Sequence, residues 1–307
     1  MLTPSQIAHF NTFGFLILPQ AFTPAEMQDI INESNDLWHQ DHHNQTATGH
    51  QHIVPFVEMC PLLAQLPEDD RIYQPVEQLL GPGFVWGGSE GNKGSFNETN
   101  DHQWHSDRAG ELELQYTRIK IMLYFQPMHK DNGALRLIPG SHHPNFHQQL
   151  LVLQPQQQET SFGAFGVPGP ELACFPVEVA PGDIVLFNQY LFHGVYGKQD
   201  GRSYIAIKFA ARPTCQNHIA SLKKHKQDAS TLHDSFRHSR RPRRSVWPWC
   251  STQAGGWRGL ARTDSPSPHA PRIGRTSALR ARSRWCGRWS PRMRCRSGPH
   301  RGVVRRP

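Results

Sequence analysis

Alternation of apolar and polar residues with a period of two restricts the middle of this chain to strand-based folds. One face of residues 118–126 (RIKIMLYFQ) carries the apolar side chains Ile119, Ile121, Leu123 and Phe125. Long polar and aromatic side chains lie on the opposite face. If the apolar face packs against helices, Lys120 and Tyr124 point into the interior of the protein. The alternative is that their face lies in solvent.

The surrounding sequence extends this pattern to a whole domain. Further strands are predicted at 134–138, 175–179, 184–188, 190–196 and 203–210. Turn sequences rich in Gly, Pro, Asn and Asp separate them. Two helices that begin with capping boxes at Thr3 and Thr23, and a third over 72–80, precede most of the strands. This order predicts a mainly β protein, a sandwich or barrel buttressed by N-terminal helices.

Composition divides the chain at residue 237. Residues 237–307 contain 19 Arg, no Lys and one acidic residue, whereas residues 1–236 contain 14 Lys+Arg and 24 Asp+Glu. The excess of positive charge therefore lies in the C-terminal part alone, which excludes a nucleic-acid-binding role for the whole protein on the basis of its pI. We predict one domain over 1–236 and a disordered Arg/Pro/Trp-rich tail over 237–307.

Two interpretations of the tail stay open. A GC-rich gene read out of frame produces many Arg and no Lys, so a frameshift near 236–240 is one hypothesis. The other is an Arg-rich arm that binds nucleic acid or anionic membrane non-specifically.

The sequence contains few signals of cellular location. No apolar run approaches the ~18 residues that span a bilayer, and the first residues, MLTPSQIAHF, lack the pattern of a signal peptide. Within residues 1–236, the cysteines Cys60, Cys174 and Cys215 have no paired spacing, which is typical of reduced thiols. We expect a cytoplasmic protein without a membrane anchor.

Two stretches are expected to be loops. Residues 87–95 (GGSEGNKGS) are rich in glycine but lack the Gly-Lys-Ser/Thr ending of a phosphate-binding loop, so flexibility is the preferred interpretation. Residues 148–170 are rich in Gln, Gly and Pro and are predicted to form a long loop.

The segment HQWHSDR contains a possible metal-binding pair. His105 and Asp107 are two positions apart, and on a strand this spacing projects both side chains from one face. His193, in a later predicted strand, is the candidate third ligand. Two His and one carboxylate on one side of a metal leave positions open and suit non-haem Fe(II). Arg202, at the start of the next strand, offers a guanidinium for the far carboxylate of a dicarboxylate cosubstrate.

A His-x-Asp triplet is a weak signal by itself, because His39-Gln40-Asp41 is a second copy. That copy lies at the end of a predicted helix, where a separation of two residues is about 200° around the axis, so the pair is predicted to be solvated surface. The His-rich stretch 39–52 lacks regular ligand spacing and is predicted to be a polar loop.

The order of the motifs resembles the phytanoyl-CoA dioxygenase family of Fe(II)/2-oxoglutarate oxygenases. The similarity covers roughly residues 2–215 and includes GFLIL, FTPAEM, WHSD and DNGALRLIPGSH. It implies a double-stranded β-helix, a cupin-like jelly roll with iron between two sheets. It also implies that His105, Asp107 and His193 ligate Fe(II) and that Arg202 binds the distal carboxylate of 2-oxoglutarate.

The same resemblance implies an activity. The enzyme would hydroxylate a small organic substrate with O2 and 2-oxoglutarate and release succinate and CO2. Related halogenases lack the ligating carboxylate, which this chain retains as Asp107. Lys120 and Tyr124, if they point inward, are further candidates for contact with cosubstrate or substrate.

Several questions stay open at this level. The substrate could be an acyl-CoA ester or a small metabolite. A non-oxidative cupin-like metal-binding protein is the first alternative, and it would have no use for Arg202 as a 2-oxoglutarate anchor. An inactive member of the same fold is the second.

Overall fold

The computed structural model describes residues 1–40, 50–94, 101–108, 116–151 and 166–228. The predicted tail and its boundary at residue 236 lie outside these residues. So do Asp41 of the second His-x-Asp triplet and most of the predicted loop over 148–170.

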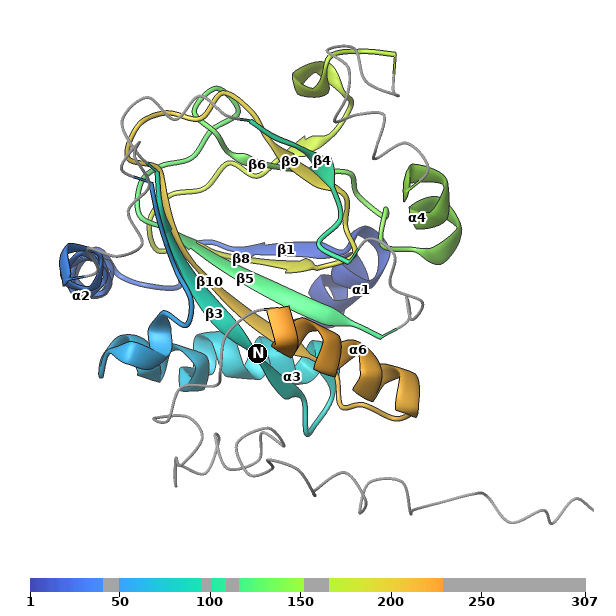
Figure 1. Ribbon diagram of the computed structural model, residues 1–307, viewed down its shortest axis with the longest axis horizontal. Coiled ribbons are helices and arrows are strands. Elements are labelled where there is room, and N and C mark those ends of the chain that lie inside the picture. Colours follow the sequence, from blue (N-terminus) through green and yellow to red (C-terminus); the bar gives the residue numbers. More distant parts are fainter. Residues whose placement is uncertain (41–49, 95–100, 109–115, 152–165, 229–307) are drawn as a thin grey trace, which may run out of the picture. The chain divides into compact units, whose positions relative to one another are not determined.

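The strands form two antiparallel sheets that face each other (Figure 1). The larger, six-stranded sheet has the order β1 (Phe15–Leu18), β8 (Ile184–Asn188), β5 (Arg118–Tyr124), β10 (Ser203–Ala210), β3 (Val85–Lys93) and β2 (Gln51–Ile53). The smaller, four-stranded sheet has the order β4 (His102–His105), β9 (His193–Val195), β6 (Leu135–Leu137) and β7 (Phe175–Pro176). This arrangement of two facing sheets is that of the predicted jelly roll.

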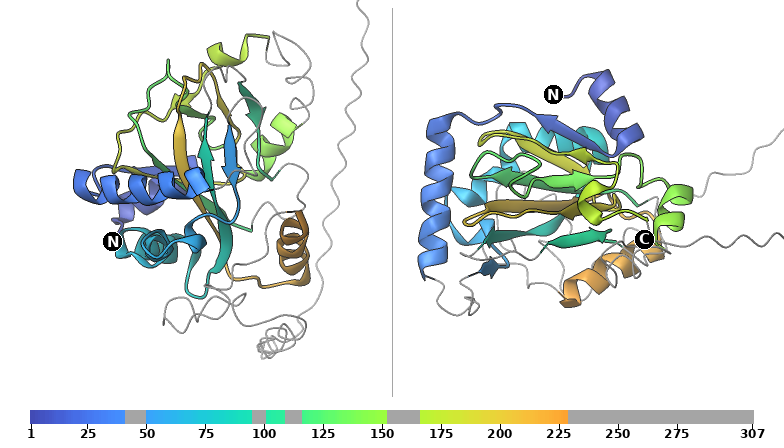
Figure 2. Two further views of the ribbon diagram at one scale, coloured as in Figure 1. Left: turned by 60° about the vertical axis from the view of Figure 1, so that its left-hand side comes forward. Right: turned by 90° about the horizontal axis from the view of Figure 1, so that it is seen from above.

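Helices cover the outer face of the larger sheet (Figures 1 and 2). They are α1 (Pro4–Phe13), α2 (Pro24–Gln40) and α3 (Asp70–Leu80), with the short 3-10 helices η1 (Val57–Met59) and η2 (Leu63–Glu68). Both predicted capping boxes are present: Gln6 N–H donates to Thr3 Oγ1 and Glu26 N–H donates to Thr23 Oγ1. The helices thus begin where the sequence predicts, because the caps satisfy their first backbone donors.

The alternation in β5 divides the core into two layers. Ile119, Ile121 and Leu123 belong to a cluster that also contains residues of α2 and α3. Met122 and Tyr124 belong to a second cluster, between the two sheets. The inward orientation of Lys120 and Tyr124 is therefore confirmed, and the solvent-exposed alternative is wrong for Tyr124, which is 1% exposed.

The expectation of a flexible loop at 87–95 is wrong for its first seven residues. They belong to β3, which pairs with β2 on one side and β10 on the other. The glycines permit close approach instead of flexibility: a Cβ on Gly91 would overlap the ring of Phe56, and one on Gly87 would lie 2.9 Å from the carbonyl oxygen of Lys208.

Three further segments complete the fold. Residues 148–151, expected to be loop, are the last turn of α4 (Pro144–Leu151), and η3 spans Gly169–Glu171. After β10, α6 (Gln216–Asp228) packs against the end of β3 and β10 through Leu222. None of the helices in the described part of the chain has the length and apolar character needed to cross a membrane.

Candidate metal centre

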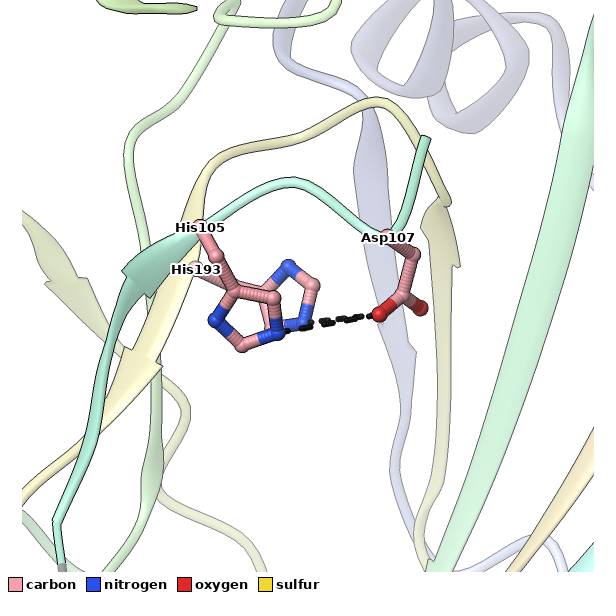
Figure 3. Close-up of side chains that lie close together, drawn as sticks. All are labelled: His105, Asp107 and His193. Atoms are coloured by element: carbon pink, nitrogen blue, oxygen red, sulfur yellow. Dashed lines mark ion pairs between the residues drawn. The ribbon is translucent and has the colours of Figure 1, made fainter. Parts of the chain in front are cut away.

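Two histidines of the smaller sheet lie opposite each other on neighbouring strands. His105 is the last residue of β4, His193 is the first of β9, and the two are cross-strand partners. Their imidazole centroids are 4.3 Å apart. Figure 3 shows both rings side by side on the interior side of these strands, turned toward Asp107. Antiparallel pairing thus joins residues that are far apart in the sequence.

Asp107 joins them from a turn and not from a strand. The strand geometry considered for the His105-Asp107 pair ends at His105, the last residue of β4, and Asp107 lies in the turn that follows. Its Oδ1 atom is 3.7 Å from Nε2 of His105 and 3.6 Å from Nε2 of His193. One possible ligand atom from each of the three residues lies within 4.8 Å of the others.

The turn that carries Asp107 is fastened to the segment just before His193. The Ser106 hydroxyl donates a 3.3 Å hydrogen bond to the carbonyl of Tyr190. The Arg108 guanidinium donates two hydrogen bonds, of 2.9 and 2.6 Å, to Oε1 of Gln189. Gln189 in turn donates from its backbone N–H to the carbonyl of Arg118, at the start of β5. These contacts fix the carboxylate relative to both sheets.

Backbone carbonyls orient both imidazoles. Nδ1 of His105 lies 2.7 Å from the carbonyl oxygen of Gln103, and Nδ1 of His193 lies 2.9 Å from that of Leu191. A carbonyl oxygen can only accept, so each Nδ1 carries the proton in these bonds. The lone pair of the neutral ring then lies on Nε2, the atom that faces Asp107, which is how metal-binding histidines are commonly held.

Burial and neighbouring charges set the protonation of the triad. Burial, followed by the charge of His105, lowers the pKa of His193 to about 3, so this ring is neutral at pH 7. Burial alone would raise the pKa of Asp107, but the charge of Lys120 above all, together with its contacts to the two histidines, holds this pKa well below its usual range. Burial opposes protonation of His105 also, yet the hydrogen bond and charge of Asp107 raise the pKa of this imidazole. A metal ion would displace that proton.

A chain of charges extends from Asp107 along the inner face of the larger sheet. Lys120 Nζ is 3.4 Å from Asp107 Oδ2 and 3.1 Å from Glu90 Oε1. Glu90 Oε2 is 2.5 Å from Lys208 Nζ and 3.6 Å from Nε2 of His52. The sequence did not indicate Glu90, because the glycines around it obscured the strand. His52 was assigned to a polar loop, but it lies in β2 (Gln51–Ile53), and the predicted strand 203–210 gave no sign that Lys208 pairs with Glu90.

Arg202 lies near Tyr124 on the same inner face. Its Nε donates a 2.8 Å hydrogen bond to the carbonyl of Gly133, and Nη2 donates one of 3.3 Å to the hydroxyl of Tyr124. The guanidinium carbon lies 5.3 Å from the ring centre of Tyr124 and 4.9 Å from that of Tyr204. Arg202 is 7% exposed, and within the described ranges no carboxylate forms an ion pair with it.

The predicted turn Pro139–His142 has a structural contact with the site. Ser141 Oγ accepts a 2.8 Å hydrogen bond from the backbone N–H of Phe192, the residue before His193. This contact agrees with the interpretation of the segment as a structural turn.

The three side chains are chemically suitable for iron. Two neutral imidazole nitrogens and one carboxylate oxygen, on one side of a common point, are the donor set that non-haem Fe(II) enzymes use. The ligand atoms face one another, and each imidazole has its other nitrogen fixed by a backbone carbonyl.

The family model described as Phytanoyl-CoA dioxygenase (PhyH) matches residues 10–197, more than half of the chain. No curated protein matches the chain in sequence.

Solved structures resemble it in fold. HygX from Streptomyces hygroscopicus, with nickel and 2-oxoglutarate bound, has a TM-score of 0.57 at 20% identity, over 68% of this chain and 87% of HygX. EctD from S. alaskensis, with bound Fe, has a TM-score of 0.53 at 19% identity, over 68% and 77%. The non-heme alpha-ketoglutarate-dependent epimerase SnoN from nogalamycin biosynthesis has a TM-score of 0.52 at 18% identity, over 75% and 92%. These likenesses confirm the predicted jelly-roll fold.

Proposed function

The chain belongs to the phytanoyl-CoA dioxygenase family, and from this membership we propose that it hydroxylates a small organic molecule at the site formed by His105, Asp107 and His193. Enzymes of this family depend on Fe(II) and 2-oxoglutarate, so the class of enzyme and its cofactors follow from the family. The identity of the ligands, the cosubstrate contacts and the kind of substrate are our proposal.

The convergence of three ligand atoms carries this proposal. Nε2 of His105, Nε2 of His193 and Oδ1 of Asp107 would hold the metal, because Oδ1 lies 3.7 and 3.6 Å from the two Nε2 atoms and the three residues form one group of possible ligands. Three protein ligands on one side leave the other positions of the ion to small molecules. The bound iron and 2-oxoglutarate supply the activation of O2, with succinate and CO2 as products.

Arg202 would bind the far carboxylate of 2-oxoglutarate. A buried guanidinium is costly without an anion, and within the described residues its polar contacts are a carbonyl and a phenol oxygen, both neutral. A carboxylate ligand would supply the missing negative charge through a charge-assisted hydrogen bond. Tyr124, which already contacts the guanidinium, would lie next to the same carboxylate.

The substrate class is proposed from relatives and from charge. A HygX structure holds hygromycin B and a SnoN structure holds nogalamycin RO, both small organic molecules. Residues 1–236 carry an excess of acidic residues, which does not favour the polyphosphate of an acyl-CoA ester. We therefore favour a small metabolite over a CoA ester.

Two broader proposals accompany the activity. The oxygenase domain would extend over residues 1–236, since β10 and α6 lie beyond the family match but complete the fold. A cytoplasmic location is supported by the free thiols of Cys60, Cys174 and Cys215.

Anaerobic thermal unfolding of the full chain tests the activity proposal. We expect stabilisation by Fe(II) and further stabilisation by 2-oxoglutarate only when the metal is present, about 2.7 kcal/mol for each ligand at one hundred times its Kd. His105→Ala should abolish both effects. His39→Ala, which removes an exposed histidine at the end of α2, is the matched control and should retain them.

Two results would contradict the proposal. Stabilisation by metal with indifference to 2-oxoglutarate would indicate a non-oxidative cupin-like metal protein. A folded protein that responds to neither ligand would indicate an inactive member of the fold.

A further inference from the structure

We propose that Lys120 is a positioning residue for Asp107: it holds the Oδ2 atom so that Oδ1 is the oxygen presented to the metal. This inference rests on the proposed function of the triad. It assigns to Lys120 a role different from direct contact with 2-oxoglutarate or substrate.

The two oxygens of Asp107 have different neighbours. Oδ1 faces Nε2 of both histidines, at 3.7 and 3.6 Å. Oδ2 is 3.4 Å from Nζ of Lys120. A carboxylate can rotate about its Cβ–Cγ bond and exchange its oxygens, since this torsion is broad. The contact on Oδ2 opposes that rotation and keeps a single oxygen directed at the histidines.

Lys120 is itself held in place from the other side. Glu90 Oε1 lies 3.1 Å from Nζ of Lys120, and the second oxygen of Glu90 lies 2.5 Å from Nζ of Lys208. Lys120 and Lys208 are direct cross-strand partners on β5 and β10. Two like charges in such a pair repel each other. Glu90, on β3, offsets this repulsion by pairing with both lysines.

The burial of these charges indicates a role beyond packing. The side chain of Lys120 is 13% exposed and that of Glu90 is 11% exposed. Desolvation of such ions costs several kcal/mol, and apolar residues of similar volume are often at least as stabilising. The carboxylates of Asp107 and Glu90, at 3.4 and 3.1 Å from Nζ of Lys120, offset that cost by direct ion pairing. A permanent cation here is useful because it holds the carboxylate on which metal binding depends.

Replacing Lys120 with an uncharged residue has two opposing effects on the affinity for a metal ion. Whether the affinity rises or falls therefore shows which effect is larger. Lys120 repels a metal ion, and if that repulsion dominates, an uncharged residue at position 120 strengthens metal binding. If Lys120 acts by orienting Asp107, the uncharged residue weakens it. Residues that orient a ligating carboxylate contribute about 10- to 100-fold to metal affinity or activity.

The test is titration of the full chain with Co(II) alone, without 2-oxoglutarate, followed by calorimetry and by the visible absorption of the bound ion. Lys120→Met should raise the Kd for Co(II) by about 10- to 100-fold and change the absorption spectrum. Lys120→Arg, which keeps a cationic donor, should restore most of the affinity. Lys208→Met is the matched control, because it removes the other lysine that pairs with Glu90 and leaves the contact of Lys120 with Asp107. It should change the Kd by less than about threefold.

Thermal unfolding of the metal-free variants shows whether each one folds. If Lys120→Met does not fold, Lys120→Gln takes its place, since its amide can still donate to Oδ2 without the charge, and a smaller loss of affinity is expected.

Two outcomes would overturn the inference: unchanged or tighter Co(II) binding by Lys120→Met, or an equal loss of Co(II) affinity in Lys120→Met and Lys208→Met. Failure of the proposed function looks different, because the unsubstituted protein would then bind Co(II) no better than His105→Ala.

Discussion

A buried positive charge lies near each end of the inner face of β5, and the two charges have opposite surroundings. At one end, Lys120 lies between two carboxylates, those of Asp107 and Glu90, at 3.4 and 3.1 Å. At the other end, Tyr124 contacts Arg202, whose polar contacts in the described part of the chain are neutral oxygens. The four-residue separation of Lys120 and Tyr124 corresponds to about 13 Å along the strand.

This difference indicates what each end can bind. A cation that two carboxylates already neutralise has little attraction left for an anionic ligand, and it acts through the carboxylates that it holds. A buried guanidinium between two tyrosine rings retains its charge and its remaining donors. Under the proposed function, the end at Asp107 would hold a metal cation on anionic and neutral ligands, and the end at Arg202 would receive an anion.

Loss of a metal ligand should have the largest effect. His193→Ala removes one Nε2 from the three-atom group, and because residues that merely orient ligands already contribute 10- to 100-fold, we expect Fe(II) affinity to fall by more than about 100-fold. Succinate production from 2-oxoglutarate should fall to the level without enzyme. Anaerobic Fe(II) titration and succinate assay measure the two effects. Retained iron affinity would remove His193 from the site.

Arg202→Gln is expected to have the next largest effect. It should weaken binding of 2-oxoglutarate and leave metal binding nearly unchanged. Loss of a buried charge that pairs with a ligand costs about 2–4 kcal/mol, so the Kd for 2-oxoglutarate should rise by roughly 30- to 1000-fold. Fe(II) affinity should stay within about threefold of the original. Calorimetric titration of the metal-loaded protein with 2-oxoglutarate measures the change, with the exposed Arg212→Gln as control. Equal weakening of metal binding would mean that the two ends are not separate.

Tyr124→Phe should have the smallest effect. It removes the oxygen that accepts the 3.3 Å hydrogen bond from Arg202 and leaves the ring in place. A typical hydrogen bond contributes about 0.5–1.5 kcal/mol, so the KM for 2-oxoglutarate should rise by about 2- to 10-fold at unchanged iron affinity. Tyr204→Phe is the matched control, since the ring of Tyr204 also contacts Arg202 but the hydrogen bond goes to Tyr124. An equal effect of both variants would contradict a role for this bond.

Much of the fold could be predicted from local patterns. The limits of β8 and β10 match the predicted strands 184–188 and 203–210, because a buried strand with turn residues at both ends is a strong local signal. The capping residues Thr3 and Thr23 also act within four residues of chain. The sequence does not predict a strand over 87–93, because glycines are rare in strands. They are required here by close neighbours, such as the ring of Phe56, which only the tertiary structure shows.

The candidate site, like the fold, could be predicted from the sequence only in part. Residue type and order were enough to select one group of candidate ligands, His105, Asp107 and His193. The structure brings these three side chains together. Their role as iron ligands stays a prediction. The reason given for the first pair was incomplete, since Asp107 reaches its place from a turn that Ser106 and Arg108 fasten to the segment before His193. Those contacts join residues more than eighty positions apart, so no local pattern reports them.

The sequence by itself determined which side chains share a face of a strand and where the first two helices and several strands begin. It also determined that two imidazoles, a carboxylate and a guanidinium are present in an order typical of one family. Period, capping and composition are local properties of the chain, so they can be read without a structure. The tertiary structure decided that Lys120 contacts Asp107 and Glu90 while Arg202 contacts Tyr124. Strand register brings these partners together, and it depends on the packing of the whole sheet.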